Sequence, residues 1–270
     1  MNSNVTWLTK PKKNLITFCF FLVRQLYRIV IVIPYTIIIS IAQFFITLLN
    51  KQNVGQHDGI CFIITSVIYP KQKALSYAKT RSVYSPEERA LQTLKTIASI
   101  KERAPAAKIV LIESGLQKSL PFNLENEVQK YVYVGDNFFV RRACDSRFKS
   151  LGEAMMILIG MKNIELRADL YFKISGRYFL DENFNLNAWR TEYFRFFYIR
   201  PDYISTRLYS FGKSMLLKWK FALIKGLPLL FLDYPIEHVL DRFVDNKYIV
   251  KADKVGVMGA DATTGSIVKE

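Results

Sequence analysis

Two apolar runs flank an amphipathic helix pattern between residues 60 and 113, and this arrangement restricts the fold more than any other stretch. Ile60–Ser66 and Lys108–Glu113 are continuous apolar runs, typical of strands buried on both faces. Between them, Ser85 and Pro86 can start a helix, and Glu88 stands three residues after the serine, as a capping box requires. A strand, a helix and a strand within about 55 residues predict a βαβ unit with a right-handed crossover.

The rest of the chain continues this alternation. We expect strands at 131–134, 171–180, 194–199 and 203–211, helices at 124–129, 151–161, 216–232 (interrupted at Gly226 and Pro228) and 236–243, and a hairpin over 254–268. This order predicts an α/β domain with a mixed sheet that is largely parallel at its start. Ligands of such sheets bind beyond the carboxyl ends of the strands. Ser66, Glu113, Ser114 and the strand 171–180 should therefore lie close together.

The N-terminal part differs from this domain. Residues 1–13 are polar, 14–50 are mostly apolar, 51–58 form a polar linker, and 59–270 form the α/β domain. The run Ile29–Leu49 carries no charge and is long enough to cross a bilayer as a helix. Most flanking cations precede it, which favours a cytoplasmic N-terminus. A cleaved signal peptide fits less well. Three geometries stay open: a single span, a surface or re-entrant segment bent at Pro34, or a buried pair of core helices.

Composition limits the class of partner. The net charge is +15, from 38 Lys and Arg against 23 Asp and Glu, which suits nucleic acid, acidic lipids or phosphorylated substrates. Nucleic acid is the least favoured, because the aromatic residues fall in apolar strands and do not alternate with basic runs. The three cysteines and two histidines lack metal-ligand spacing, so no zinc site is predicted. GxGxxG, Walker, GxSxG and HExxH motifs are also absent from the sequence.

The strand predicted at 171–180 holds the most specific candidate site. Lys173 and Arg177 are four residues apart, so on a regular strand they point to the same side, with Gly176 between them. Like charges on one side repel unless an anion or water lies between them, and glycine permits close approach of a ligand or another backbone. We expect this strand to present both cations to a phosphate; the alternative is an exposed basic strand face.

Three segments resemble nucleotide-sugar glycosyltransferases of the GT-A-like kind found in bacterial surface-polysaccharide clusters. They are residues 80–97 (TRSVYSPEER, then QT and TI), Lys149-Ser150-Leu151-Gly152-Glu153, and Phe172–Leu180. The resemblance implies a Rossmann-related GT-A fold and a nucleotide-sugar donor. GT-A enzymes usually hold Mn²⁺ or Mg²⁺ with an Asp-x-Asp motif, which this sequence lacks. A divalent metal therefore stays open as a cofactor.

Without that motif, cations and hydroxyls must neutralise the departing phosphate. The resemblance assigns this role to Lys173, Arg177, Tyr178 and Arg207. It further implies Glu237 as the catalytic base, since GT-A enzymes often carry their base late in the domain, where Glu237 starts a helix.

Three more residues are candidate contacts for the donor or acceptor: Ser66, Glu153 and Asp136. Each candidate also has an ordinary interpretation. Glu237 and Glu153 suit the first turn of a helix, Asp136 suits a turn, and Arg207 suits a solvated strand.

Together these features predict a membrane-associated glycosyltransferase that moves a sugar from a nucleotide-sugar to a hydroxyl of a glycan or lipid-linked acceptor, in surface polysaccharide synthesis. In a bacterium the donor is cytoplasmic, so the domain should lie at the cytoplasmic face of the inner membrane and the surface or re-entrant geometry should hold. In a eukaryote a single span would give a lumenal, Golgi-type enzyme. The alternative is a non-enzymatic, membrane-anchored basic protein that binds anionic glycans or other polyanions.

Overall fold

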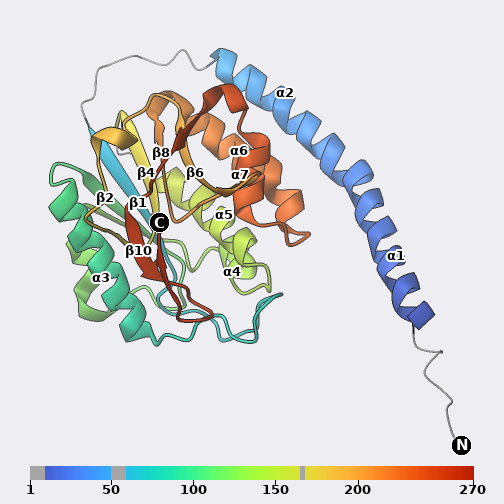
Figure 1. Cartoon of the computed structure of the whole chain (residues 1–270), viewed down its shortest axis with the longest axis horizontal. Coiled ribbons are helices and arrows are strands. Elements are labelled where there is room, and N and C mark those ends of the chain that lie inside the picture. The colour runs from blue at the N-terminus through green and yellow to red at the C-terminus, as the bar shows by residue number, and fades with distance from the viewer. Residues whose placement is uncertain (1–9, 50–58, 165–167) are drawn as a thin grey trace, which may run out of the picture. The chain divides into compact units, whose positions relative to one another are not determined.

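The computed structural model of the chain (Figure 1) describes residues 10–49, 59–164 and 168–270. It divides into two compact units, Met1–Lys51 and Gln52–Glu270. The predicted linker 51–58, and residues 1–9 of the predicted polar N-terminus, lie outside the described residues.

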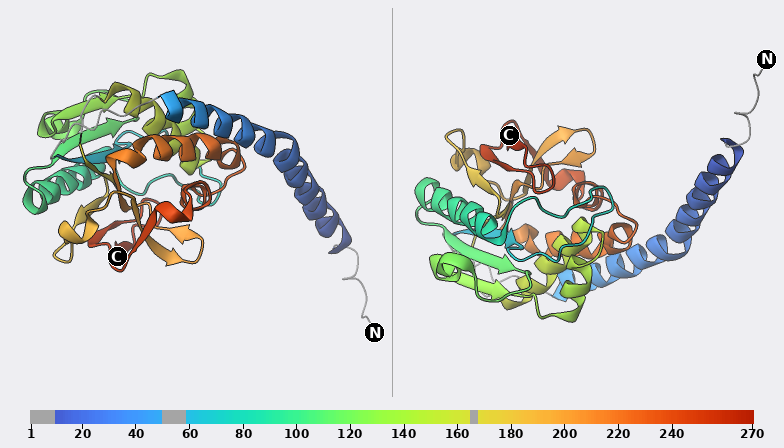
Figure 2. Two further views of the ribbon diagram at one scale, coloured as in Figure 1. Left: turned by 90° about the horizontal axis from the view of Figure 1, so that it is seen from above. Right: turned by 90° about the horizontal axis from the view of Figure 1, so that it is seen from below.

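The N-terminal unit is a helix with one irregular turn. Helix α1 spans Lys10–Tyr27 and α2 spans Ile33–Leu49, and the π-helical turn Arg28–Val32 joins them. This turn ends two residues before Pro34, whose ring would clash with a carbonyl of the preceding turn in a regular helix. The wider turn accommodates the proline, and the helix axis changes direction here (Figure 2). The stretch Cys19–Ile46 is long and apolar enough to cross a membrane, and its most apolar window is 6% buried.

The second unit contains a large mixed sheet in the order β3-β2-β1-β4-β8-β6-β7, with β9 pairing β6. Its parallel part comprises β1 (Ile60–Ser66), β2 (Lys108–Glu113), β3 (Lys130–Tyr133) and β4 (Leu170–Ser175). Its other part comprises β8 (Leu208–Gly212), β6 (Phe194–Arg200), β7 (Tyr203–Ile204) and β9 (Ile249–Ala252). Strand β8 is antiparallel to β4 and β6, β6 is antiparallel to β7, and β9 is parallel to β6. The predicted α/β fold with a mixed sheet, parallel at its start, is confirmed.

A small antiparallel sheet lies beside it, in the order β11-β10-β5. It is built from β5 (Tyr178–Leu180), β10 (Val257–Ala260) and β11 (Ile267–Lys269). Strands β10 and β11 form the hairpin expected near the C-terminus.

Helices cover both faces of the large sheet. Helix α3 (Pro86–Arg103) packs over Phe62 and Ile64 of β1 in one apolar core. Helix α5 (Lys149–Gly160) lies on the opposite face, where Gly160 lies against Ile112. The remaining helices are α4 (Phe138–Cys144), α6 (Leu216–Leu230) and α7 (Ile236–Phe243), with short 3₁₀ turns at Pro121–Glu127, Met161–Asn163, Asn187–Trp189, Lys213–Met215 and Asn246–Tyr248.

The capping box predicted for α3 is present. The backbone N–H of Glu88 donates to Ser85 Oγ at 3.2 Å, and the N–H of Ser85 donates to Glu88 Oε2 at 2.7 Å. Both bonds satisfy donors that a helix start leaves free.

Three predicted elements are wrong in extent. The strand 171–180 is two strands, β4 and β5, which belong to different sheets. The strand 203–211 also divides, into β7 and β8, and the predicted helix 124–129 is the 3₁₀ segment Pro121–Glu127. Helix α4 and strand β9 were not predicted.

Helix α6 continues through Gly226 and Pro228, where we expected a break. The reason for the glycine is packing against α7. A Cβ at residue 226 would lie 2.0 Å from Cγ1 of the buried Val239. The glycine therefore serves close helix contact instead of ending the helix.

We expect Gly226→Ala to lower the free energy of unfolding by about 1–3 kcal/mol, because overpacking outweighs the helix propensity that alanine gains. Urea denaturation followed by far-ultraviolet circular dichroism measures the change. In a Val239→Ala background the same substitution should cost much less, since the contacting methyl groups are gone. Equal costs in both backgrounds would contradict the packing explanation.

Candidate active site

The loops that follow the parallel strands meet at one edge of the sheet. The N–H of Ser114 donates to Ser66 O at 3.2 Å, and the N–H of Gly176 donates to Thr65 O at 2.9 Å. The predicted gathering of Ser66, Ser114 and the end of β4 is thus confirmed.

Two cavities open at this edge. The strand-end cavity is lined by residues that include Ser66, Lys71, Arg81, Arg89, Arg141 and Ala262, and the Glu237 cavity by residues that include Tyr77, Tyr178, Tyr203, Arg207, Glu237 and Asp261. They share Lys149, Glu153, Ser175 and Arg177, so the two cavities adjoin.

A tight turn at Gly176 ends β4 and places Arg177 in the shared wall. Thr93 Oγ1 donates to Gly176 O at 2.9 Å, and a Cβ on this glycine would lie 3.0 Å from that hydroxyl and 3.3 Å from Thr65 O. The group that closely approaches Gly176 is therefore another part of the protein and not a ligand. Arg177 leaves the line of β4 and lines both cavities.

Lys173 points elsewhere. It pairs with Ile63 and Tyr209 in the sheet and is completely buried. Its ammonium donates to Glu153 Oε1, to Ser175 Oγ at 3.0 Å and to Thr206 O at 3.1 Å. The expectation that Lys173 and Arg177 share a strand side, and so a phosphate, was wrong, because the strand ends between them. Lys173 lines neither cavity and lies behind the site.

Glu153 connects this buried lysine to the cavities. Its side chain is 17% exposed and lines both. Burial acts to raise its pKa, but the charges of Lys173, Lys149 and Arg177 outweigh burial and hold the pKa below its ordinary value. The group is therefore a carboxylate at neutral pH.

Glu237 lies in the first turn of α7 and accepts a hydrogen bond from Thr206 Oγ1 at 2.8 Å. The backbone carbonyl of Thr206 accepts from Lys173. One buried ammonium thus supports two carboxylates of the site, Glu153 directly and Glu237 through Thr206.

Three of the other candidate residues line a cavity, and one lies on the protein surface. Tyr178 and Arg207 line the Glu237 cavity, where Arg207 lies 5.5 Å from the Tyr178 ring and forms an ion pair with Glu270. Ser66 lines the strand-end cavity. Asp136 is exposed in the turn before α4 and lines neither cavity.

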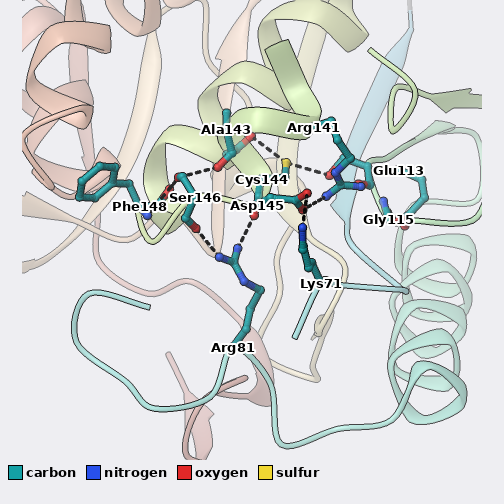
Figure 3. A network of polar contacts seen from close by, with 12 residues as sticks. Lys71, Arg81, Glu113, Gly115, Arg141, Ala143, Cys144, Asp145, Ser146 and Phe148 are labelled. Carbon is teal, nitrogen blue, oxygen red and sulfur yellow. Dashed lines mark hydrogen bonds and ion pairs between the residues drawn. The ribbon is translucent and has the colours of Figure 1, made fainter. Parts of the chain in front are cut away.

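Sequence reasoning missed most of the cations around the strand-end cavity. Most of them are held by protein groups (Figure 3): Arg81 donates to the carbonyls of Cys144 and Ser146 at the end of α4, and Arg141 donates to Ser114 O at 3.0 Å and pairs with Asp145 at 2.7 Å. Lys71 also approaches Asp145, at 3.9 Å. Arg89 donates to Val67 O and Ser82 Oγ at 2.6 and 2.9 Å.

Lys149 and Arg177 differ from these cations. Within the ranges that the structure describes, neither forms an ion pair, and Nη1 of Arg177 is buried without a hydrogen-bond partner. Burial and the charge of Arg177 lower the pKa of Lys149, and the same two causes lower that of Arg89 to about 9. Glu153 offsets part of this repulsion, but it is already paired with Lys173. Two cations that repel one another and form no ion pair of their own are suited to binding an anion.

The sequence carries a signal for some of the cations around the strand-end cavity and none for others. Arg81 and Arg89 lie in the segment 80–97, and Lys149 opens the segment 149–153, so all three belong to the segments that carry the resemblance, but none was given a role in the site. Arg141 sits on the unpredicted helix α4, and no local pattern marks it.

The same edge is a poor match for a divalent metal. In residues 10–49, 59–164 and 168–270, no three histidine, cysteine or carboxylate side chains are grouped to hold one. Three of the four carboxylates that line the Glu237 cavity are engaged separately: Glu153 with Lys173, Glu237 with Thr206, and Asp261 with Thr263 and Thr264 of its own loop. The fourth, Asp233, is exposed. The shared wall offers nitrogen cations, which repel a metal ion.

Comparisons with known proteins give structural neighbours only. No protein-family model and no curated protein matches the chain. It is similar to the galactosyltransferase LgtC in complex with donor and acceptor sugar analogs (10% identity, 71% of this chain and 73% of that chain, TM-score 0.45) and to the inositol-1-phosphate CTP transferase from T. maritima (13%, 73% and 87%, 0.45). The bifunctional glycosyltransferase WbbM is a third neighbour (12%, 74% and 40%, 0.44). With identities this low, the argument for a function rests on the chemistry of the site.

We expect Lys173→Met to lower the free energy of unfolding by about 2–4 kcal/mol, because it leaves the largely buried Glu153 carboxylate without its partner. The double variant K173M/E153Q should recover most of the loss, since the charge is removed with its partner. Denaturant unfolding of both variants and of E153Q measures the coupling. A Lys173→Met protein of unchanged stability and weakened donor binding would instead restore the direct phosphate role.

Proposed function

We propose that the chain is a glycosyltransferase that uses a nucleotide-sugar donor. The observation that supports this most is the pair Lys149 and Arg177, two unpaired cations in the wall between two cavities at the carboxyl ends of parallel strands. Two such cations match the charge of a diphosphate, and arginine can contact phosphate through two N–H groups. The strand-end cavity takes the nucleotide, and the Glu237 cavity takes the transferred sugar and the acceptor.

The reaction follows from these positions. An acceptor hydroxyl attacks the anomeric carbon; a new carbon–oxygen bond forms to the acceptor, and the bond to the diphosphate oxygen breaks. The bonding electrons leave with the diphosphate, whose negative charge Lys149 and Arg177 stabilise. Glu237, oriented by the Thr206 hydroxyl, accepts the proton of the acceptor. Arg207 and Tyr178, which also line the Glu237 cavity, contact the donor.

The setting of the enzyme is part of the proposal. The helix Cys19–Ile46 associates with a membrane, and the acceptor is a glycan or a lipid-linked sugar used in surface polysaccharide synthesis. In a bacterium the donor is made in the cytoplasm, which puts the catalytic unit on the cytoplasmic face of the inner membrane.

A non-enzymatic polyanion-binding protein is the competing function, and the net charge of +15 is what favours it. Such binding uses many surface cations, depends steeply on salt and is insensitive to single cavity residues. Site-directed variants of the cavity therefore separate the two functions.

We expect Arg177→Ala and Lys149→Ala each to weaken binding of a nucleotide-sugar by about 10- to 100-fold, the effect of losing one charge-assisted hydrogen bond. Arg190→Ala, which removes an exposed arginine outside both cavities, is the matched control. Isothermal titration against a panel of uridine, guanosine and cytidine nucleotide-sugars provides the measurement.

Three results would count against the proposal. If no nucleotide-sugar in the panel binds, the enzyme assignment fails. If all three variants bind equally well, the placement of the phosphates is wrong. Binding that requires added Mn²⁺ would contradict a site that uses cations alone.

Glu237→Gln should lower the transfer rate by about 10²- to 10⁴-fold and leave donor affinity nearly unchanged. Glutamine still accepts the hydrogen bond from Thr206 but cannot take up a proton. Release of the free nucleoside diphosphate in the presence of acceptor gives the rate. Full activity of this variant would remove Glu237 from the role of base.

A further inference from the structure

Three large apolar side chains are exposed just beyond the carboxyl ends of β2 and β3. Leu116, Phe138 and Phe139 are 52%, 64% and 65% exposed, and the two phenylalanine rings contact each other edge to face at 5.5 Å. Lys118 and Arg142 are exposed beside them. These five residues are called the aromatic rim below.

The loop after β2, which carries Leu116, contacts the turn that leads into α4, which carries both phenylalanines. Tyr133 OH donates to Gly115 O at 3.1 Å, and a Cβ on Gly135 would lie 2.3 Å from that same carbonyl. Leu116 directly follows one of these glycines, and Phe138 lies three residues after the other. The rim is therefore one surface, assembled from the loop after β2 and the helix α4.

This surface stands on a fixed base. Arg141, on the helix that carries both phenylalanines, donates to Ser114 O and pairs with Asp145 (Figure 3). Arg81 holds the end of the same helix through two carbonyls. The exposed rings are thus presented by a short helix that is tied to the strand ends.

The charge around the rim is positive. The guanidinium of Arg142 lies 5.4 Å from the Phe138 ring, and Lys118 follows Leu116 by two residues. Asp136 is the exposed acid in the same turn, and Lys71 adds a further exposed cation on the neighbouring loop. Aromatic rings beside lysine and arginine are typical of surfaces that lie at a membrane–water interface.

We propose that the aromatic rim inserts into the headgroup region of a bilayer that contains acidic lipids. Phe138, Phe139 and Leu116 enter the boundary of the acyl chains, and Lys118 and Arg142 contact the lipid phosphates. The two cavities lie at the same edge of the sheet, so this contact brings their entrance to the membrane surface. The proposal concerns the α/β unit itself and does not depend on the transferase assignment or on how the N-terminal helix meets the membrane.

Depth measurements on the full chain in vesicles test this. In a Cys19→Ser background the remaining cysteines, Cys61 and Cys144, are buried, so a nitroxide can be placed at Phe139→Cys. The control site is Glu102→Cys, exposed at the end of α3 near the opposite edge of the sheet. On vesicles of equal phosphatidylglycerol and phosphatidylcholine, the ratio of oxygen to nickel-chelate accessibility should be several-fold higher at residue 139 than at residue 102.

Charge reversal supplies the second arm. K118E/R142E should return the accessibility of the label at residue 139 to that of the control site. K108E/K130E changes the net charge equally at the amino ends of β2 and β3 and should leave the label inserted.

Several results would overturn the proposal. A label at residue 139 that stays accessible to the nickel chelate on acidic vesicles shows that the rim does not insert. Equal effects of the two charge reversals show attraction by net charge alone. Dipolar broadening between labels at residue 139, without oxygen accessibility, shows that a second copy of the chain covers the rim.

Discussion

The buried ammonium of Lys173 is the interaction on which the arrangement of the site depends. Burying an ammonium costs several kcal/mol unless all of its donors are satisfied. Here three donors meet three acceptors, which belong to α5, to the end of β4 and to the segment between β7 and β8. Each acceptor must hold its place for the charge to be tolerated, so the lysine fixes Glu153 and Thr206 together. The proposed base then depends on this group through the hydroxyl of Thr206.

Elements whose signals are local were predictable from the sequence. The strands β1 and β2 are uninterrupted apolar runs, and Ser85, Pro86 and Glu88 identify the start of α3 and its capping box. The parallel edge followed from the strand–helix–strand order, and with it the meeting of Ser66 and Ser114.

Features set by distant partners were not predictable. The strand that we expected at 171–180 ends early because Gly176 bonds to Thr65 in β1 and to Thr93 in α3. The alternation of side chains along a strand carries no information about such bonds. We therefore expected Lys173 and Arg177, which are four residues apart, to point to the same side of one strand. The cations of the strand-end cavity come from separate helices and loops, and no regular spacing in the sequence indicates that they meet. Gly226 shows the same limit, since only the position of Val239 explains it.

The crowding of Arg81, Arg89, Arg141, Lys149 and Arg177 around one cavity has a practical consequence for handling the protein. Their mutual repulsion opposes folding when the cavity holds only water, and any small oxyanion that enters relieves it. A ligand that binds the folded chain alone stabilises it in proportion to the logarithm of its concentration. Phosphate or sulfate in a purification buffer would therefore stabilise the folded protein. Carried into an assay, the same ion would compete with phosphorylated ligands for the cavity. Measured affinities for phosphorylated ligands will then depend on the choice of buffer salt.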